Sequence, residues 1–172
     1  MGKYPIPTHL INILKVNESH SDIRNINGNI ICNCGCEKFR IMQNEDREYG
    51  TSLPYGEQDG MKITAVCEDC GKTMLLFDEA TQGYNGFVCH DCKTAKDESL
   101  TLLKCKKCGE SAFRVIMGIE VEDQEQFMEE CVEEFPEEFA PEDFVNAFNW
   151  ITVTVRCANC CNEDEWISLE LS

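Results

Sequence analysis

The stretch WITVTVRCANC, residues 150–160, decides the fold that this sequence predicts. It is similar to an earlier stretch, GMKITAVCEDC, residues 60–70. In each, β-branched residues at alternate positions lead directly into a Cys-x-x-Cys sequence. The alternation predicts a strand, and two cysteines at this spacing predict a tight turn, a knuckle, that directs two thiolates at one metal ion. The sequence therefore predicts strands that end in metal-binding knuckles.

The cysteine content requires either disulfides or metal. Thirteen of the 172 residues are cysteine, far above average usage. The first residues do not resemble a secretory signal, and no apolar run approaches membrane-spanning length, so we expect a cytoplasmic protein. Thiols stay reduced in that compartment, which favours metal over disulfides.

The residues after the first cysteines repeat later in the chain. Cys34-Gly35 is followed, after three residues, by Phe39-Arg40 and a β-branched residue, and Cys108-Gly109 is followed in the same way by Phe113-Arg114. Each copy then continues with a strand, a Cys-x-x-Cys and a second apolar strand. The chain is therefore expected to contain two copies of one module.

This repeat sets the expected organisation. We expect an α+β fold, mainly antiparallel β, with an N-terminal helix and linker over 1–26, a first module over 27–88, a linker over 89–99 and a second module over 100–172. Leu10, Ile11 and Leu14 fall on one face of a helix expected within residues 4–16. Asn27-Gly28 indicates a turn. The second module carries a helical insertion, 121–149, in which Phe127, Cys131 and Phe135 recur at helical spacing, with Cys131 in the core.

The pattern resembles the zinc ribbon, a family of small β modules with one structural four-cysteine zinc site, and the resemblance covers each repeat. It implies one zinc ion held by Cys105, Cys108, Cys157 and Cys160. It implies a second held by Cys67 and Cys70 with two of Cys32, Cys34 and Cys36. The first knuckle departs from the family pattern, because it contains no Cys-x-x-Cys.

The choice among the three early cysteines depends on the repeat. We expect Cys32 and Cys34, because Cys34 aligns with Cys108 and Cys32 lies nearest the position of Cys105; Cys36 aligns with a glutamate. Pairs that include Cys36 are the alternatives. At the last knuckle Cys161 replaces a glycine, and the repeat favours Cys160 over Cys161 as the ligand.

Cys89 and Cys92 form a further Cys-x-x-Cys. Their distances along the chain from Cys70 and from Cys105 also fit metal-binding spacing, so rival partitions of the cysteines are open. The repeat favours two zinc sites that leave this pair out. Cys89 and Cys92 are then part of a third, incomplete site or plain linker thiols.

The charge limits the partners. A net charge of −17 has the wrong sign for binding nucleic acid, although Lys104, Lys106 and Lys107 form a small basic group. Twelve acidic residues lie from Glu120 to Asp143, and no lysine or arginine occurs between Arg114 and Arg156. An acidic surface of this kind is either simply solvated or attracts a basic partner.

No pattern in the sequence indicates catalysis. Four thiolates close a zinc site, whereas catalytic zinc keeps an open position, and no metalloprotease, deaminase, phosphate-loop or hydrolase motif occurs. We therefore expect a non-enzymatic protein-interaction module, such as an inhibitor or immunity protein for a basic partner. The alternative is a nucleic-acid or transcription-associated ribbon that uses Lys104, Lys106, Lys107, Arg114 and Arg156.

Overall fold

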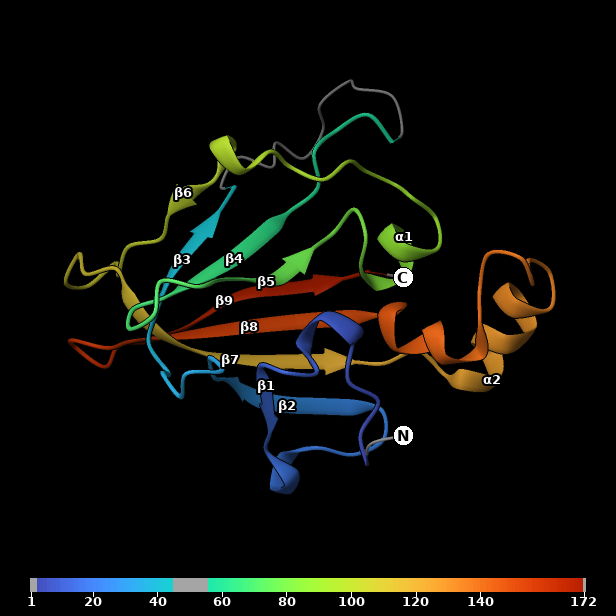
Figure 1. The fold of residues 1–172 in the computed structure, drawn as a ribbon, viewed down its shortest axis with the longest axis horizontal. Helices are drawn as coiled ribbons and strands as arrows, with labels where there is room; N and C mark the ends of the chain where they lie inside the picture. Colours follow the sequence, from blue (N-terminus) through green and yellow to red (C-terminus); the bar gives the residue numbers. More distant parts are fainter. Residues whose placement is uncertain (1–2, 45–55, 172) are drawn as a thin grey trace.

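The computed structural model describes residues 3–44 and 56–171, and every structural statement refers to that part of the chain. It is mostly antiparallel sheet with a few short helices, which confirms the expected fold class at that level (Figure 1). The strands are β1 Leu14–Val16, β2 Asn25–Ile30, β3 Phe39–Gln43, β4 Lys62–Cys67, β5 Thr73–Asp78, β6 Thr101–Leu102, β7 Ala112–Glu120, β8 Trp150–Cys157 and β9 Glu163–Glu170. The helical segments are η1 Thr8–Leu10, η2 Glu18–His20, α1 Gly83–Phe87, η3 Asp97–Ser99, α2 Gln124–Phe127, η4 Met128–Val132 and η5 Pro141–Asn146.

Two three-stranded units make up most of the sheet. In the first unit β4 pairs with β3 and β5, and in the second unit β8 pairs with β7 and β9. The units join where β3 pairs with β7, with Phe39 opposite Phe113 and Arg40 opposite Ala112. β2 also pairs with β7, β1 pairs with β2, and β6 pairs with the end of β3.

The two units pair their strands in the same register. Phe39 lies opposite Cys67 in the first unit, and Phe113 lies opposite Cys157 in the second. The β4–β5 hairpin and the β8–β9 hairpin also shift register at the same distance from the knuckle. The shift lies between Ile63 and Thr64 in β4 and between Val153 and Thr154 in β8. The similarity read from the two cysteine-containing stretches thus extends to the hydrogen-bonded pairing of the strands.

One hydrophobic core runs through both units. Alternate residues of β3, β4, β7 and β8 are buried in it, as the period of a strand requires. Phe39 is fully buried, and its neighbour Phe113 is 3% exposed. A second, smaller cluster joins the insertion to α1 through Phe127, Cys131, Phe139 and Phe144.

The N-terminal segment differs from the expected helix. Only the single 3-10 turn η1 forms within residues 4–16, and Leu14 enters β1, where it pairs with Ile30. The prediction of a turn at Asn27-Gly28 is also wrong, because both residues lie inside β2. A side chain at Gly28 would place its Cβ only 2.5 Å from the Lys15 carbonyl oxygen, so the glycine allows β1 and β2 to approach closely.

The insertion is helical, as expected, but in short pieces. α2 begins after Asp123, whose carboxylate accepts hydrogen bonds from the Glu125 and Gln126 N–H groups, and it continues directly into the π-helical turn η4. η5 begins at Pro141, in the first turn of a helix, where proline is favoured. Cys131 is 1% exposed and lies in the small core, as expected.

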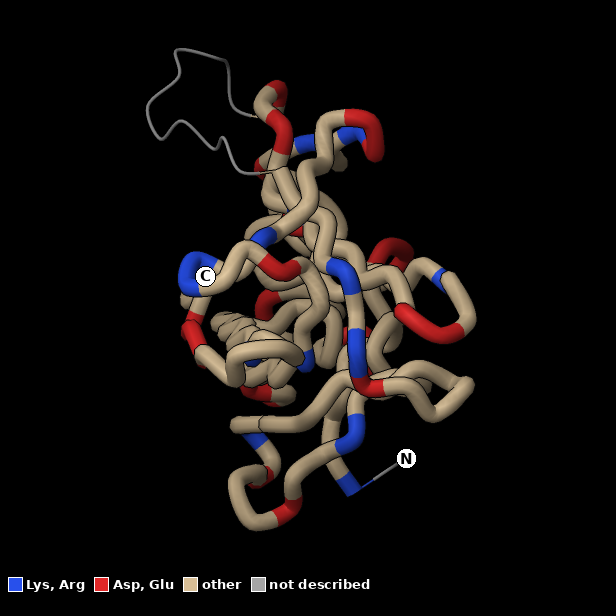
Figure 2. The backbone as a smooth tube through the Cα atoms, turned by 90° about the vertical axis from the view of Figure 1, so that its left-hand side faces the viewer, with Lys and Arg blue, Asp and Glu red and all other residues tan. Residues whose placement is uncertain are grey.

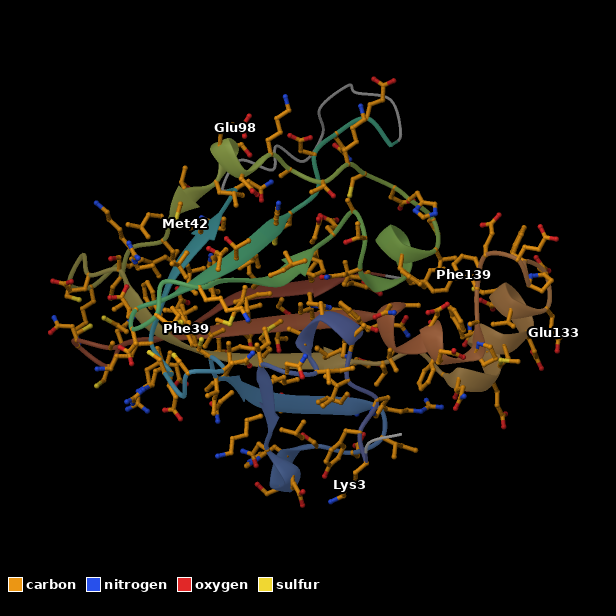
Figure 3. All side chains as sticks on the ribbon, in the orientation of Figure 1. Lys3, Phe39, Met42, Glu98, Glu133 and Phe139 are labelled. Atoms are coloured by element: carbon orange, nitrogen blue, oxygen red, sulfur yellow. The ribbon has the colours of Figure 1, made fainter. Side chains whose placement is uncertain are left out.

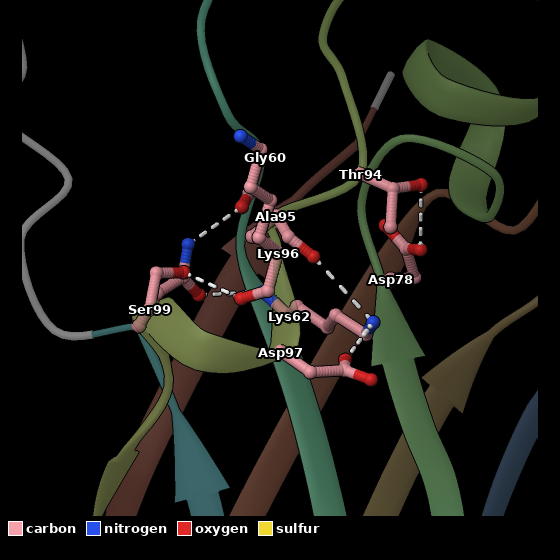
Figure 4. A network of polar contacts seen from close by, with 9 residues as sticks. Gly60, Lys62, Asp78, Thr94, Ala95, Lys96, Asp97 and Ser99 are labelled. Atoms are coloured by element: carbon pink, nitrogen blue, oxygen red, sulfur yellow. Dashed lines mark hydrogen bonds and ion pairs between the residues drawn. The ribbon is translucent and has the colours of Figure 1, made fainter.

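The chain between the units is tied to the first unit by polar contacts (Figure 4). Lys62 of β4 donates to Asp97 at 2.6 Å and to the Ala95 carbonyl at 3.5 Å, and Thr94 donates to Asp78 at 2.9 Å. The Lys62 side chain is only 15% exposed, so its charge requires this partner.

The knuckles and the insertion lie at opposite ends of the molecule. Figure 1 shows the turns after β4, β8 and β6 together at the left, and α2 at the right. Figure 3 shows Phe39 near the first end and Glu133 at the other. Among residues 3–44 and 56–171, no helix has the length and apolar character needed to cross a membrane.

Candidate metal centres

Cys32, Cys34, Cys67 and Cys70 form the first candidate centre, and their sulfur atoms all lie within 4.8 Å of one another. Cys32 and Cys34 come from the turn between β2 and β3, and Cys67 and Cys70 from the turn between β4 and β5. The sulfur atoms of Cys32 and Cys70 lie 3.6 Å apart, as do those of Cys34 and Cys67. The structure thus brings together the four cysteines that the sequence singles out.

Cys105, Cys108, Cys157 and Cys160 form the second candidate centre, within the same limit of 4.8 Å. The sulfur atoms of Cys105 and Cys160 lie 3.6 Å apart, and those of Cys108 and Cys157 lie 3.5 Å apart. In both centres the first cysteine of one knuckle therefore lies next to the second cysteine of the other. The repeated register of the strands produces this repeated arrangement.

The distances fit a tetrahedral metal ion. Four sulfurs at about 2.3 Å from one zinc ion are about 3.8 Å apart, close to the separations in both centres. A disulfide would need about 2.05 Å, and all thirteen cysteines are free. Each of the two groups can hold a metal ion, and thiolate sulfur is a donor that zinc prefers.

Backbone hydrogen bonds close all four knuckles, and the first knuckle is one residue shorter than the other three. The N–H groups of Gly35, Gly71, Gly109 and Cys161 donate to the carbonyl groups of Cys32, Cys67, Cys105 and Cys157, at 2.7 to 3.1 Å. These four donors all have positive φ: 91°, 71°, 79° and 58°. Glycine adopts that backbone without strain, so its presence in three of the four knuckles follows from the turn itself.

The knuckle backbone favours the thiolate form of one ligand in each centre, Cys67 and Cys105, whereas hydrogen bonds to neighbouring thiols and burial raise the pKa of Cys34 and Cys160. The Cys70 N–H, followed by that of Asp69, lowers the pKa of Cys67 to about 6. The N–H groups of Cys108 and Lys107 lower the pKa of Cys105 to about 6 in the same manner. Metal binding requires the deprotonated thiol, so this arrangement suits a metal ion.

The two centres sit at the edge of the core. Cys32, Cys67, Cys105 and Cys157 are buried, and the other four are exposed or half-buried. A metal ion bound by all four cysteines of a centre would have no open position for substrate or water. Chemically, such a site joins a hairpin, β4–β5 or β8–β9, to the turn that precedes β3 or β7, and it supplies no catalytic ligand position.

The other five cysteines lie outside both groups. Cys36 is buried, and its sulfur accepts a hydrogen bond from the Lys38 N–H at 3.4 Å. Cys161 is exposed, Cys89 is exposed, and Cys92 is buried close to Gly60. Within the described residues, no group of three or more potential ligands includes Cys89 or Cys92.

Basic and acidic residues are interspersed along the backbone at the knuckle end of the molecule (Figure 2). Lys106 pairs with Asp164 at 3.0 Å and Arg40 with Glu68 at 2.9 Å, and Arg114 lies 4.0 Å from Glu37. Sequence reasoning missed these pairings, because they join residues that are far apart along the chain. They leave a surface of mixed sign at this end of the molecule.

Comparisons with protein-family models, with curated proteins and with solved structures found no match.

Proposed function

We propose that the chain is a non-enzymatic zinc protein in which two structural ions each complete one zinc-ribbon-like module. The two four-cysteine groups, built on strand pairs of identical register, carry this proposal. Bound zinc would hold the knuckles together and contribute on the order of 10 kcal/mol of apparent folding free energy per site. The chain's own strands and turns position the eight sulfurs, and backbone N–H groups favour the deprotonation of Cys67 and Cys105.

We further propose that the acidic insertion engages a basic protein, as an inhibitor or immunity protein does. Glu129, Glu130, Glu133 and Glu134 are all exposed, and no lysine or arginine lies near them in sequence. The insertion projects from the end of the molecule opposite the metal centres, where a partner can reach it (Figure 3). Its acidic field would speed association with a basic surface.

A nucleic-acid ribbon is the weaker proposal. Lys106 and Arg114, two of its five basic residues, lie next to carboxylates, and each centre filled by zinc would add two negative charges to an already acidic chain. Binding to DNA or RNA that weakens steeply with salt would support it. Absence of binding at low salt would remove it.

A charge-reversal experiment tests the acidic proposal. The variant Glu129→Lys, Glu130→Lys, Glu133→Lys, Glu134→Lys should lose a basic partner recovered by the wild-type protein from its native source. The control changes exposed glutamates elsewhere, Glu18→Lys, Glu57→Lys, Glu98→Lys and Glu110→Lys, and so alters the net charge equally. Equal loss in both variants, or recovery of no basic protein, would contradict the proposal.

A further inference from the structure

A groove of about 430 Å³ lies between β9 and β6. Trp166 and Ile167 of β9 form one side, and Met61, Leu102 and Leu103 form the other. Phe113 and Val155 of the core lie at its base. Leu102 is 37% exposed, so the groove presents apolar surface to solvent.

β9 presents an unpaired edge beside this groove. In the described part of the chain β9 pairs only with β8 and β6 pairs only with β3, so each has one edge without a neighbouring strand (Figure 1). Such an edge carries a row of backbone N–H and carbonyl groups that can accept a further strand. β9 is eight residues long, which is enough to pair with an extended peptide.

The two faces of β9 differ. Asp164, Ile167 and Leu169 are half-buried, whereas Glu163, Glu165 and Glu170 are exposed. Lys106 pairs with Asp164 at 3.0 Å and so neutralises the acidic residue that lines the groove. Among the described residues, no ion pair joins Glu165 or Glu170 to a lysine or arginine. The exposed face of the edge strand is therefore acidic, whereas its groove face carries the apolar Trp166 and Ile167 together with the paired Asp164, and Lys104 also lines the groove.

The charge decides what can bind there. Two copies of β9 in antiparallel pairing would place glutamates near glutamates, between molecules that each carry a net charge of −17. An edge strand of this kind disfavours self-association. A partner strand with lysine or arginine on its exposed face avoids this repulsion between like charges.

We propose that this groove binds an extended segment of a basic protein, which adds to β9 as a further strand. Apolar side chains at alternate positions of the segment pack on Leu102, Met61 and Ile167. The intervening basic side chains face Glu163, Glu165 and Glu170. This surface is separate from the acidic insertion, so either proposal can fail without the other.

The probe is the peptide acetyl-Lys-Val-Lys-Val-Lys-Val-Lys-amide, added to the zinc-loaded full chain. Binding should change the fluorescence of Trp166 and protect β9 backbone amides from hydrogen exchange. Glu165→Lys with Glu170→Lys should weaken binding about tenfold, the sum expected for two reversed cross-strand charges. The control, Glu129→Lys with Glu133→Lys in the insertion, makes the same change in net charge and should weaken it less than about twofold.

Two forms of the peptide test strand addition. N-methylation of alternate amides along one edge should abolish binding, and along the other edge should leave it intact, because only one edge meets β9. Equal weakening by both pairs of charge reversals would mean non-specific attraction and would overturn the proposal, as would absence of binding. A concentration-dependent dimer in sedimentation that Leu102→Asp disrupts would assign the groove to a second copy instead.

Discussion

Cys161 occupies the backbone position that glycine fills in the other three knuckles. Its φ of 58° is in the left-handed region, which costs an ordinary residue roughly 1–2 kcal/mol. Its side chain is exposed and lies outside the second candidate centre, whereas Cys160 lies inside it. The turn therefore carries backbone strain that a glycine would avoid, and the Cys161 side chain takes no part in the centre.

Replacing this residue with glycine should relieve the strain. We expect Cys161→Gly to keep both zinc ions and to raise the free energy of unfolding by about 0.5–1 kcal/mol, since glycine's greater freedom in the unfolded chain offsets part of the gain. Urea denaturation of the zinc-loaded protein measures the change. Loss of a zinc ion in this variant would mean that Cys161, and not Cys160, is the ligand.

Cys36 and Cys34 offer a matched pair for counting metal ions. Native mass spectrometry should find two zinc ions in the wild-type protein and in Cys36→Ser. The Cys36 sulfur accepts a hydrogen bond from the Lys38 N–H and lies outside the group of four cysteines. Cys34→Ser and Cys157→Ser should each bind fewer than two. Three zinc ions in the wild type would bring Cys89 and Cys92 into a further site.

Among the elements, η1 is held against the edge of β5 by a single histidine. The His9 Nε2 atom lies 3.0 Å from the Leu76 carbonyl oxygen, so the neutral ring donates a hydrogen bond to it. Burial lowers the pKa of His9 from 6.5 to about 4. Leu10 beside it is fully buried, so protonation of His9 opposes the packing of this turn.

The His9 contact predicts a pH dependence. The pKa is lower in the folded state, so the stabilisation is complete above pH 6.5 and is lost as the pH falls from 6.5 to 4, by about 3 kcal/mol in all. The variant His9→Gln keeps a donor for Leu76 but does not titrate, and should lack this part of the decline. At each pH, the difference in the free energy of unfolding between the two proteins is measured by denaturation. The effect of zinc loss on stability is common to both proteins and cancels in this difference. Parallel curves would show that His9 titrates normally.

Over the whole molecule, the two units share one hydrophobic core and are joined into one sheet by the pairing of β3 with β7. Phe39 and Phe113 lie opposite each other in β3 and β7, each directly beside a cysteine of its own candidate centre. A domain with a continuous core unfolds as one cooperative unit. The two centres are therefore expected to stabilise the same structure and not two independent ones.

Removing the metal ion from one centre should also destabilise the unit that contains the other centre. Both tryptophans, Trp150 and Trp166, lie in the second unit, so their fluorescence reports on it alone. We expect Cys34→Ser, which affects the first centre, to change this fluorescence and to lower the melting temperature of the whole protein. Chelation of the wild type should give coincident transitions by tryptophan fluorescence and far-UV circular dichroism. Unchanged tryptophan emission in Cys34→Ser would mean that the units fold separately.

Local patterns in the sequence predicted the knuckles and the strands that lead into and out of them, and the repeat selected the eight cysteines that gather in two groups. They could do so because strand period, knuckle spacing and the glycine turn are all properties of a few neighbouring residues. Tertiary structure alone decided that residues 14–16 and Asn27-Gly28 join the sheet, since pairing of β2 with β7, and of β1 with β2, overrides local helix and turn preferences. It also decided that β3 meets β7 and that a groove opens beside β9, because contacts between distant segments leave no signal in the spacing of residues along the chain.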